Sequence, residues 1–198
     1  MTSTHQAIVR TWLSGAALAL LLTACASQQP RPQTDPDGAK VDRVLMLTAQ
    51  RLAIANEVAK AKWNTHSPVT DAARERRILA ALTKQAQRRG IDPDFARRYF
   101  ESQIEASKMV QHARFSEWAA DGRGKFRDAP DLRRDIRPAL DRLTPQILDA
   151  LAQALPVIRK PGGQRMVLEH AQTVLLANGG EAAAWQVAVQ PLAAAAAK

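Results

Sequence analysis

Apolar and polar residues alternate along most of the chain with the spacing of α-helices. Between residues 41 and 63, apolar side chains recur every three or four positions, which predicts one long helix. A capping residue followed by proline marks the next two helix starts, at Ser67-Pro68 and at Asp92-Pro93. We expect these helices to end at Gly90 and near Ala120.

Prolines make it harder to predict where the helices of the C-terminal part begin and end. After a basic, glycine-containing loop the helical pattern resumes at Asp131, but Pro138 and Pro145 each require a first turn or a kink. The start of this helix therefore stays open at the level of the sequence. Two shorter helices are predicted near the C-terminus, roughly over residues 164–177 and 181–189.

The composition supports the same fold class. Of the 198 residues, 46% are hydrophobic and only 5% are aromatic. Alanine and leucine are abundant, which favours helices, whereas strands are enriched in β-branched residues. We predict an all-α protein with a single domain over residues 40–198, built of about five to six helices.

The first 24 residues have the pattern of an export signal. A basic start precedes an apolar stretch, residues 12–22, that is too short for a permanent membrane span. The stretch ends in Leu22-Thr23-Ala24-Cys25, which resembles the lipobox of bacterial lipoproteins, where cleavage leaves the cysteine to carry a lipid. We predict a signal peptide over residues 1–24 and lipidation of Cys25.

Residues 25–39 contain three prolines and almost nothing apolar, which is typical of a flexible tether. The product would be exported to the periplasm and anchored to a membrane, with the outer membrane favoured because Ala26 follows the cysteine. Ordinary cleavage after Ala26 is the alternative, and its product would be secreted and soluble. Cys25 is the only cysteine, so no intramolecular disulfide can form.

The net charge narrows the choice of partners. It is +9 for the whole chain and falls to +8 without residues 1–24, which contain Arg10 and no acid. Such a charge suits a nucleic acid, an anionic lipid or a small anion. The arginines are interspersed with acids and lack the aromatic neighbours that stack on bases. We therefore expect a small anionic metabolite and no nucleic acid.

The chain offers no motif for a metal or a cofactor. Its four histidines are scattered, and no helix carries a His-x-x-x-His pair. Neither a phosphate-binding loop nor a Gly-x-Ser-x-Gly motif is present. We therefore predict no metal site and no cofactor.

Cations occur where the helical pattern expects apolar side chains. Arg51 and Lys62 are eleven residues apart, which leaves them about 20° out of register on one helix face. Unpaired charges on an apolar face are costly, and a bound anion would compensate for them. Taken singly, each of these residues is more often a solvated or ion-paired helix residue. Two further polar sets each share a helix face: Asp71, Arg74 and Glu75, and Ser107 with Gln111.

Taken together, these positions resemble those of the all-helical chorismate mutases, specifically their secreted subclass. The resemblance is strong over residues 41–121 and faint after residue 144. It implies the chorismate mutase type II fold, with three long helices enclosing the active site. It also implies the Claisen rearrangement of chorismate to prephenate, a step of aromatic amino acid biosynthesis, without metal, cofactor or covalent intermediate. The motifs that carry it are Arg51-Leu52, Ala61-Lys62-Trp63, Asp71 with Arg74-Glu75, Ile91-Asp92-Pro93, Gln103-Ile104 with Ser107 and Gln111, and Arg114-Phe115-Ser116-Glu117-Trp118.

The resemblance implies that arginines hold the two substrate carboxylates. Arg51, Arg74 and Arg137 would share them, because planar guanidinium groups match the geometry of a carboxylate. Arg133 and Arg134 compete for the place of Arg137. We choose Arg137 because its surroundings match best if one residue is inserted upstream.

The other matched residues would act on the ether oxygen and the hydroxyl of the substrate. Lys62 and Gln111 would donate to the ether oxygen, whose negative charge grows in the transition state. Ser107 would hydrogen-bond one carboxylate, and Glu75, with Asp71 nearby, would hold the hydroxyl. Some secreted relatives carry glutamate at the position of Gln111. The neutral amide predicts a rate that is flat near neutral pH.

Two other functions fit the same pattern. An isochorismate pyruvate lyase of the same helical family would use a similar cation-lined pocket and release pyruvate. A non-catalytic envelope lipoprotein would bind an anion without turnover. A homodimer is compatible with each function, with each active site built within one chain.

Overall fold

The structure is a computed structural model that describes residues 35–195. Within this range there are six α-helices, one π-helical turn and no β-strand, so the all-α prediction is confirmed. The predicted signal peptide and the lipidation site at Cys25 lie outside the described residues. The elements are α1 (Pro36–Thr65), α2 (Ala72–Gln87), α3 (Pro93–Ala120), η1 (Leu132–Ile136), α4 (Arg137–Ile158), α5 (Gly163–Asn178) and α6 (Ala182–Ala194).

Two of the long helices begin with the same device, a capping aspartate followed by proline. Asp92 caps α3, which begins where the sequence predicted. Asp35 caps α1 by accepting a hydrogen bond from the backbone N–H of Asp37. Residues 36–39, which the sequence assigned to the tether, therefore form the first turn of α1.

The second helix begins later than predicted. Ser67-Pro68 lies in the loop before α2, and Asp71 is the cap, because its carboxylate accepts the backbone N–H of Arg74 (3.0 Å). Glu75 in turn accepts the backbone N–H of Asp71 (3.2 Å). This reciprocal pair resembles a capping box and satisfies two N–H groups at the helix start. The prediction from Ser67-Pro68 was wrong because a stronger start signal follows it.

The start of the helix that follows Asp131, which the prolines left open, is a π-helical turn. In η1 the backbone N–H of Ile136 bonds to the carbonyl of Asp131 (3.2 Å), a spacing of five residues. Pro138 then falls in the first turn of α4, where its missing N–H is not needed. Pro145 lies inside α4. The last two helices occupy the predicted region, and α6 extends to Ala194.

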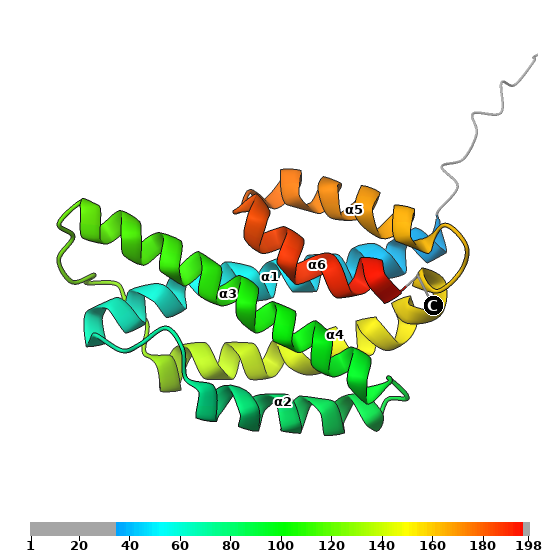
Figure 1. Cartoon of the computed structure of the whole chain (residues 1–198), viewed down its shortest axis with the longest axis horizontal. Helices are drawn as coiled ribbons and strands as arrows, with labels where there is room; N and C mark the ends of the chain where they lie inside the picture. Colours follow the sequence, from blue (N-terminus) through cyan, green and yellow to red (C-terminus); the bar gives the residue numbers. More distant parts are fainter. Residues whose placement is uncertain (1–34, 196–198) are drawn as a thin grey trace, which may run out of the picture. The chain divides into compact units, whose positions relative to one another are not determined.

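The helices α1 and α3 pack against each other along the middle of the fold (Figure 1). The helices α4 and α5 also pack on α1, while α2 and α6 pack on α3. In Figure 1, α5 lies along the top of the helical part, α6 overlaps α1 in the view, and α2 lies at the bottom. Fully buried side chains from several helices, such as Leu45, Tyr99, Leu148 and Ile158, form the main core. The helix α1 therefore has neighbours on more than one side, and it borders three cavities.

Candidate active site

Five of the eight predicted site residues line a hollow between α1, α2 and the start of α4. Two cavities of about 550 Å³ and 290 Å³ make up this hollow, and both are lined by Arg74 and Arg137. Lys62 and Asp71 line the larger cavity, and Arg51 lines the smaller one. Each volume is close to the range of roughly 300–1,000 Å³ that small-molecule sites occupy.

Arg51 is the most enclosed of the cations in the hollow. Its Nε is buried without a hydrogen-bond partner, and burial lowers the pKa of its guanidinium, while Tyr99 acts in the opposite direction. The hydroxyl of Tyr99 lies 2.7 Å from Thr48 Oγ1, and burial raises the pKa of Tyr99 to about 12. The phenol therefore stays neutral and leaves the charge of Arg51 uncompensated, which suits the binding of an anion.

Lys62 is oriented by the loop that precedes α2. Its Nζ donates a hydrogen bond to the carbonyl of Val69 (2.6 Å). Burial lowers the pKa of Lys62, and the nearby carboxylates of Glu75 and Asp71 partly counter this effect. An ammonium has three donors, so two remain for a ligand in the hollow.

Arg137 is the arginine of its segment that reaches the hollow. It lies beside Arg74, whose pKa is lowered by burial and then by the charge of Arg137. Arg133 and Arg134 are exposed, and Arg134 pairs with Asp135 at 3.1 Å. Of the three arginines that the sequence left in competition, the structure thus brings Arg137 next to Arg74.

The hollow carries more positive than negative charge. Its charged lining residues are Arg51, Lys62, Arg74 and Arg137 as cations, and Asp71 and Asp141 as acids. Four cations and two carboxylates leave an excess of two positive charges. One of the carboxylates, that of Asp71, is already engaged as the cap of α2. A dianion is therefore the ligand that would balance the charge of this hollow.

Glu75 lies on the α3 side of α2 and lines a different groove from the other predicted residues. One of its oxygens accepts the backbone N–H of Asp71, and the other lies 3.6 Å from the Nζ of Lys108. Lys108 is also 2.7 Å from Glu105. The sequence analysis missed Lys108, for which the only signal was its position next to Ser107 on α3.

Ser107 and Gln111 hydrogen-bond to each other on α3. The Nε2 of Gln111 donates to the carbonyl of Ser107 (3.0 Å) and to its hydroxyl oxygen (3.1 Å). The side chain of Gln111 is 3% exposed, and its Oε1 is buried without a partner. Neither residue lines the two cavities of the hollow, so their place in the site stays a prediction.

Aromatic side chains fix the loop that leads to η1 and Arg137. The ring of Trp63 packs edge-on against Phe115 and Trp118, and Phe126 of the loop packs on Trp118 at 4.5 Å between ring centres. The side chain of Asn64 makes two hydrogen bonds of 2.8 Å to the backbone of Phe126. The loop is thus attached to the end of α1, close to Lys62 in the sequence.

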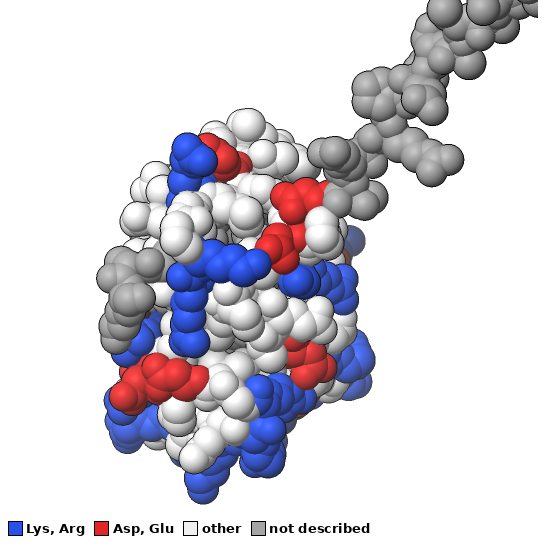
Figure 2. Space-filling view, turned by 90° about the vertical axis from the view of Figure 1, so that its right-hand side faces the viewer, with Lys and Arg blue, Asp and Glu red and all other residues white. Residues whose placement is uncertain are grey.

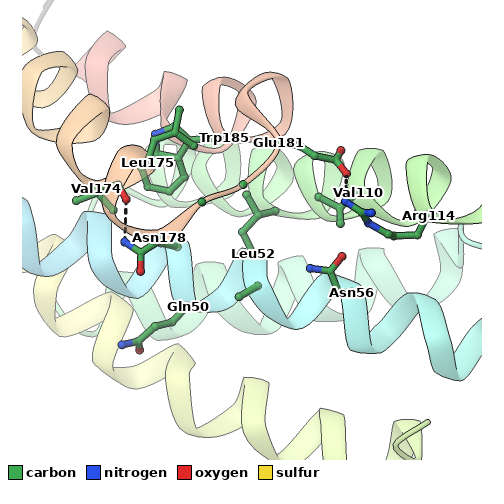
Figure 3. A pocket seen from close by; sticks show the side chains of 14 residues that line it. Gln50, Leu52, Asn56, Val110, Arg114, Val174, Leu175, Asn178, Glu181 and Trp185 are labelled. Carbon is green, nitrogen blue, oxygen red and sulfur yellow. Dashed lines mark hydrogen bonds and ion pairs between the residues drawn. The ribbon is translucent and has the colours of Figure 1, made fainter. Parts of the chain in front are cut away.

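A second pocket, of about 520 Å³, is lined by α1, α3 and the segment that joins α5 to α6. It contains none of the predicted residues. Leu52, Val110 and Trp185 supply apolar walls (Figure 3). Its charged lining residues are Arg114 and Glu181, which pair with each other at 2.9 Å. This pocket is therefore balanced in charge before any ligand binds.

The surface also mixes charges of both signs. On the face shown in Figure 2, basic side chains are interspersed with acidic ones. Arg89 pairs with Asp149 at 2.7 Å and Lys160 with Asp37 at 2.8 Å. Within residues 35–195, no group of three histidine, cysteine or acidic side chains is placed to hold a metal ion. In the same range, no helix combines the length and the apolar character needed to cross a membrane.

Comparisons with known proteins point to one family. The sequence profile of the family "Chorismate mutase type II" matches residues 40–112. A secreted chorismate mutase of Mycolicibacterium smegmatis is 33% identical over 140 residues, which cover 71% of this chain and 77% of that protein. A secreted chorismate mutase of Mycobacterium tuberculosis is 32% identical over 136 residues, covering 68% of this chain and 67% of that protein.

A solved structure agrees with these sequence matches. The crystal structure of a chorismate mutase from Burkholderia thailandensis has a TM-score of 0.73 and 34% sequence identity. The match covers 78% of this chain and 99% of that chain. The fold, the identity and the coverage together show that the chain belongs to the chorismate mutase type II family.

Proposed function

We propose that the protein is a chorismate mutase, an isomerase that converts chorismate to prephenate in the cation-lined hollow. The observation that carries this proposal is the excess of two positive charges among the residues lining the hollow. Chorismate carries two carboxylates and would balance that excess. Membership of the family supports the identity of the substrate.

The arginines would bind the substrate carboxylates and select its reactive conformer. Arg74 and Arg137 line both cavities and would share one carboxylate, while Arg51, whose Nε is buried without a partner, would donate to the other. Holding the two carboxylates apart at fixed points favours the folded conformer in which the reacting carbons approach each other. The rearrangement needs no proton transfer, so this orientation is a large part of what the protein can contribute.

The rest of the rate increase would come from donors to the ether oxygen. Lys62 lines the larger cavity, and its ammonium donates a hydrogen bond to the carbonyl of Val69. Gln111 would first have to turn its amide away from Ser107, with which it is bonded. Such donors stabilise the transition state more than the ground state because charge on the oxygen grows as the bond breaks. An acceleration of a million-fold corresponds to about 8 kcal/mol.

The acidic residues would hold the substrate hydroxyl. Asp71 lines the larger cavity, and Glu75 lies one turn further along α2 and close enough to influence the charge of Lys62. An ionised carboxylate carries only acceptors, so it can accept the hydrogen bond that the substrate hydroxyl donates. Ser107 would add a hydrogen bond to one carboxylate once Gln111 has turned.

Turnover of chorismate by the purified protein tests the proposal directly. Loss of chorismate absorbance together with formation of prephenate is the expected result. Release of pyruvate would instead identify an isochorismate pyruvate lyase when isochorismate is supplied. Binding of chorismate without any product would leave an anion-binding protein and overturn the proposed activity.

We also infer that the enzyme is exported and anchored to a membrane of the periplasm by a lipid on Cys25, with the outer membrane favoured. The names of the two relatives support export, and the motif before Cys25 supports the anchor. Radioactive palmitate should label the protein in growing cells, and Cys25→Ser should abolish the label and release the protein from the membrane fraction. Labelling that survives this substitution would contradict the anchor.

A further inference from the structure

Arg137 is the first residue of α4, and the chain before it forms one wall of the hollow. Residues 121–131 connect α3 to η1 and lead directly into this wall. Leu132 and Ile136 of η1 line the larger cavity together with Arg137, and the side chain of Ile136 is buried. A shift of the connecting segment would therefore move both a wall of the hollow and an arginine that would bind the substrate.

Asn64, near the end of α1, clamps the middle of this connecting segment. Its Nδ2 donates to the backbone carbonyl of Phe126 and its Oδ1 accepts the backbone N–H of the same residue, each at 2.8 Å. A carboxamide suits this double contact because it presents a donor and an acceptor side by side. Asn64 follows Lys62 by two residues on α1. One side chain thus fastens the connecting segment to the helix that carries Arg51 and Lys62.

The other polar contacts between this segment and α1 are longer. The Nε1 of Trp63 donates to the carbonyl of Gly124 at 3.3 Å, and the Nζ of Lys60 lies 3.3 Å from the carboxylate of Asp128. The side chain of Asp128 is 73% exposed, and an ion pair so close to solvent contributes little. Asn64 therefore makes the strongest polar attachment of the segment to α1.

We propose that Asn64 is a positioning residue, which holds η1 and the guanidinium of Arg137 at the hollow by clamping the backbone of Phe126. The inference rests on the proposed function and adds a residue that the sequence motifs do not contain. Asn64 does not line the hollow, so it acts through the segment that ends at Arg137. Without the clamp, this segment gains conformational freedom that the substrate has to remove when it binds Arg137.

The test is a double-mutant cycle with Asn64→Ala and Arg137→Ala, measured on the full chain with chorismate. Asn64→Ala should raise KM about fivefold, the factor for the net loss of one hydrogen bond. It should change kcat much less, because the substrate carboxylates keep their charge throughout the rearrangement. In the Arg137→Ala background, Asn64→Ala should have no further effect on KM, because no guanidinium is left to position.

Hydrogen exchange provides a second measurement, which does not depend on activity. The backbone N–H of Phe126 is bonded to Asn64 Oδ1, so this amide should exchange faster with solvent in Asn64→Ala than in the wild type. An unchanged exchange rate at Phe126 would show that Asn64 does not fasten the segment and would overturn the proposal.

Asn178→Ala provides the matched control. The Nδ2 of Asn178 also donates to a backbone carbonyl at 2.8 Å, that of Val174, and the residue does not line the hollow. Its removal should leave KM unchanged, and thermal unfolding should show that both asparagine variants are folded. Equal effects of Asn64→Ala with and without Arg137 would overturn the proposal, as would a KM that does not change. A wild-type protein without turnover would instead refute the proposed function itself.

Discussion

The hollow and the second pocket both border α1, and the pocket is similar in size to the larger part of the hollow but differs from it in net charge. The hollow beside α2 and α4 measures about 550 Å³ in its larger part, and its lining has four cations and two acids. The pocket beside α3, α5 and α6 measures about 520 Å³, and its one arginine is paired with its one glutamate. Size alone would not separate them.

Uncompensated charge, more than cavity volume, marks the candidate active site. A paired cation has its partner supplied by the fold, so it needs no ligand. A half-buried cation whose Nε is buried without a partner, such as Arg51, is retained at a cost to stability unless a ligand compensates for it. The following predictions test whether this difference in charge corresponds to a difference in function.

Removal of Lys62 should lower the turnover of chorismate more than any of the other substitutions. Lys62→Ala removes the ammonium that would donate to the ether oxygen, and loss of one such donor typically lowers kcat by about a hundred- to a thousandfold. Steady-state turnover of chorismate measures the effect. Thermal unfolding serves as the control, because the variant also loses the bond to Val69. Turnover close to wild type would rule out the assignment of Lys62.

Removal of Arg137 should have the next largest effect. Arg137→Ala takes away a guanidinium that lines both cavities, and we expect kcat/KM to fall by about ten- to a hundredfold, as for loss of a hydrogen bond between charged groups. Arg134→Ala is the matched control, because Arg134 is exposed and paired with Asp135. Equal losses in the two variants would show that the wrong arginine has been chosen.

The pH profile of kcat/KM should fall on the alkaline side only. Lys62 must be protonated to act, and burial lowers its pKa below the ordinary lysine value of 10.5. The profile of kcat/KM should therefore be flat through neutrality and fall on the alkaline side at a lower pH than a solvated lysine would give, by roughly tenfold per pH unit. The neutral amide of Gln111 adds no limb. A steep loss between mildly acidic and neutral pH would contradict this prediction.

A substitution in the charge-balanced pocket lined by Arg114 and Glu181 should have the smallest effect on turnover. Glu181→Gln removes one side of the pair with Arg114 but touches none of the lining residues of the hollow. We expect kcat/KM to stay within about twofold of wild type and the free energy of unfolding to fall by about 1 kcal/mol or less, as for partly exposed ion pairs. Chemical denaturation and turnover measure the two quantities. A large loss of turnover would mean that the two cavities are coupled.

Most of the helices could be predicted from the helical periodicity and the capping residues of the sequence. The start of α3 was predicted because Asp92 and Pro93 have no competitor nearby. The start of α2 was missed because its cap depends on Glu75 reaching back to Asp71, a contact between side chain and backbone that a motif of two residues does not contain. The π-helical turn before α4 was also missed, since no residue type is specific to it.

The candidate site could likewise be predicted only in part from the sequence. Arg51 and Lys62 could be placed together from their spacing on one helix face, and both line the hollow. The same reasoning grouped Glu75 with Asp71 and Arg74, but Glu75 lines the groove toward α3. Lys108 could not be found, because its partner belongs to another helix and the pairing exists only after packing. Contacts within one helix can be predicted from the spacing of its residues, whereas contacts between helices depend on how the helices pack.

The π-helical turn η1 has a consequence for how sequences of this family can be aligned. It holds one more residue than an α-helical turn would, and it lies directly before Arg137. A deletion of one residue here would return the turn to ordinary α-helix and leave the segments on both sides close to their present orientation. An insertion or deletion at this point therefore shifts the residue numbering without moving Arg137, so homologues of different length in this segment should be compared by geometry.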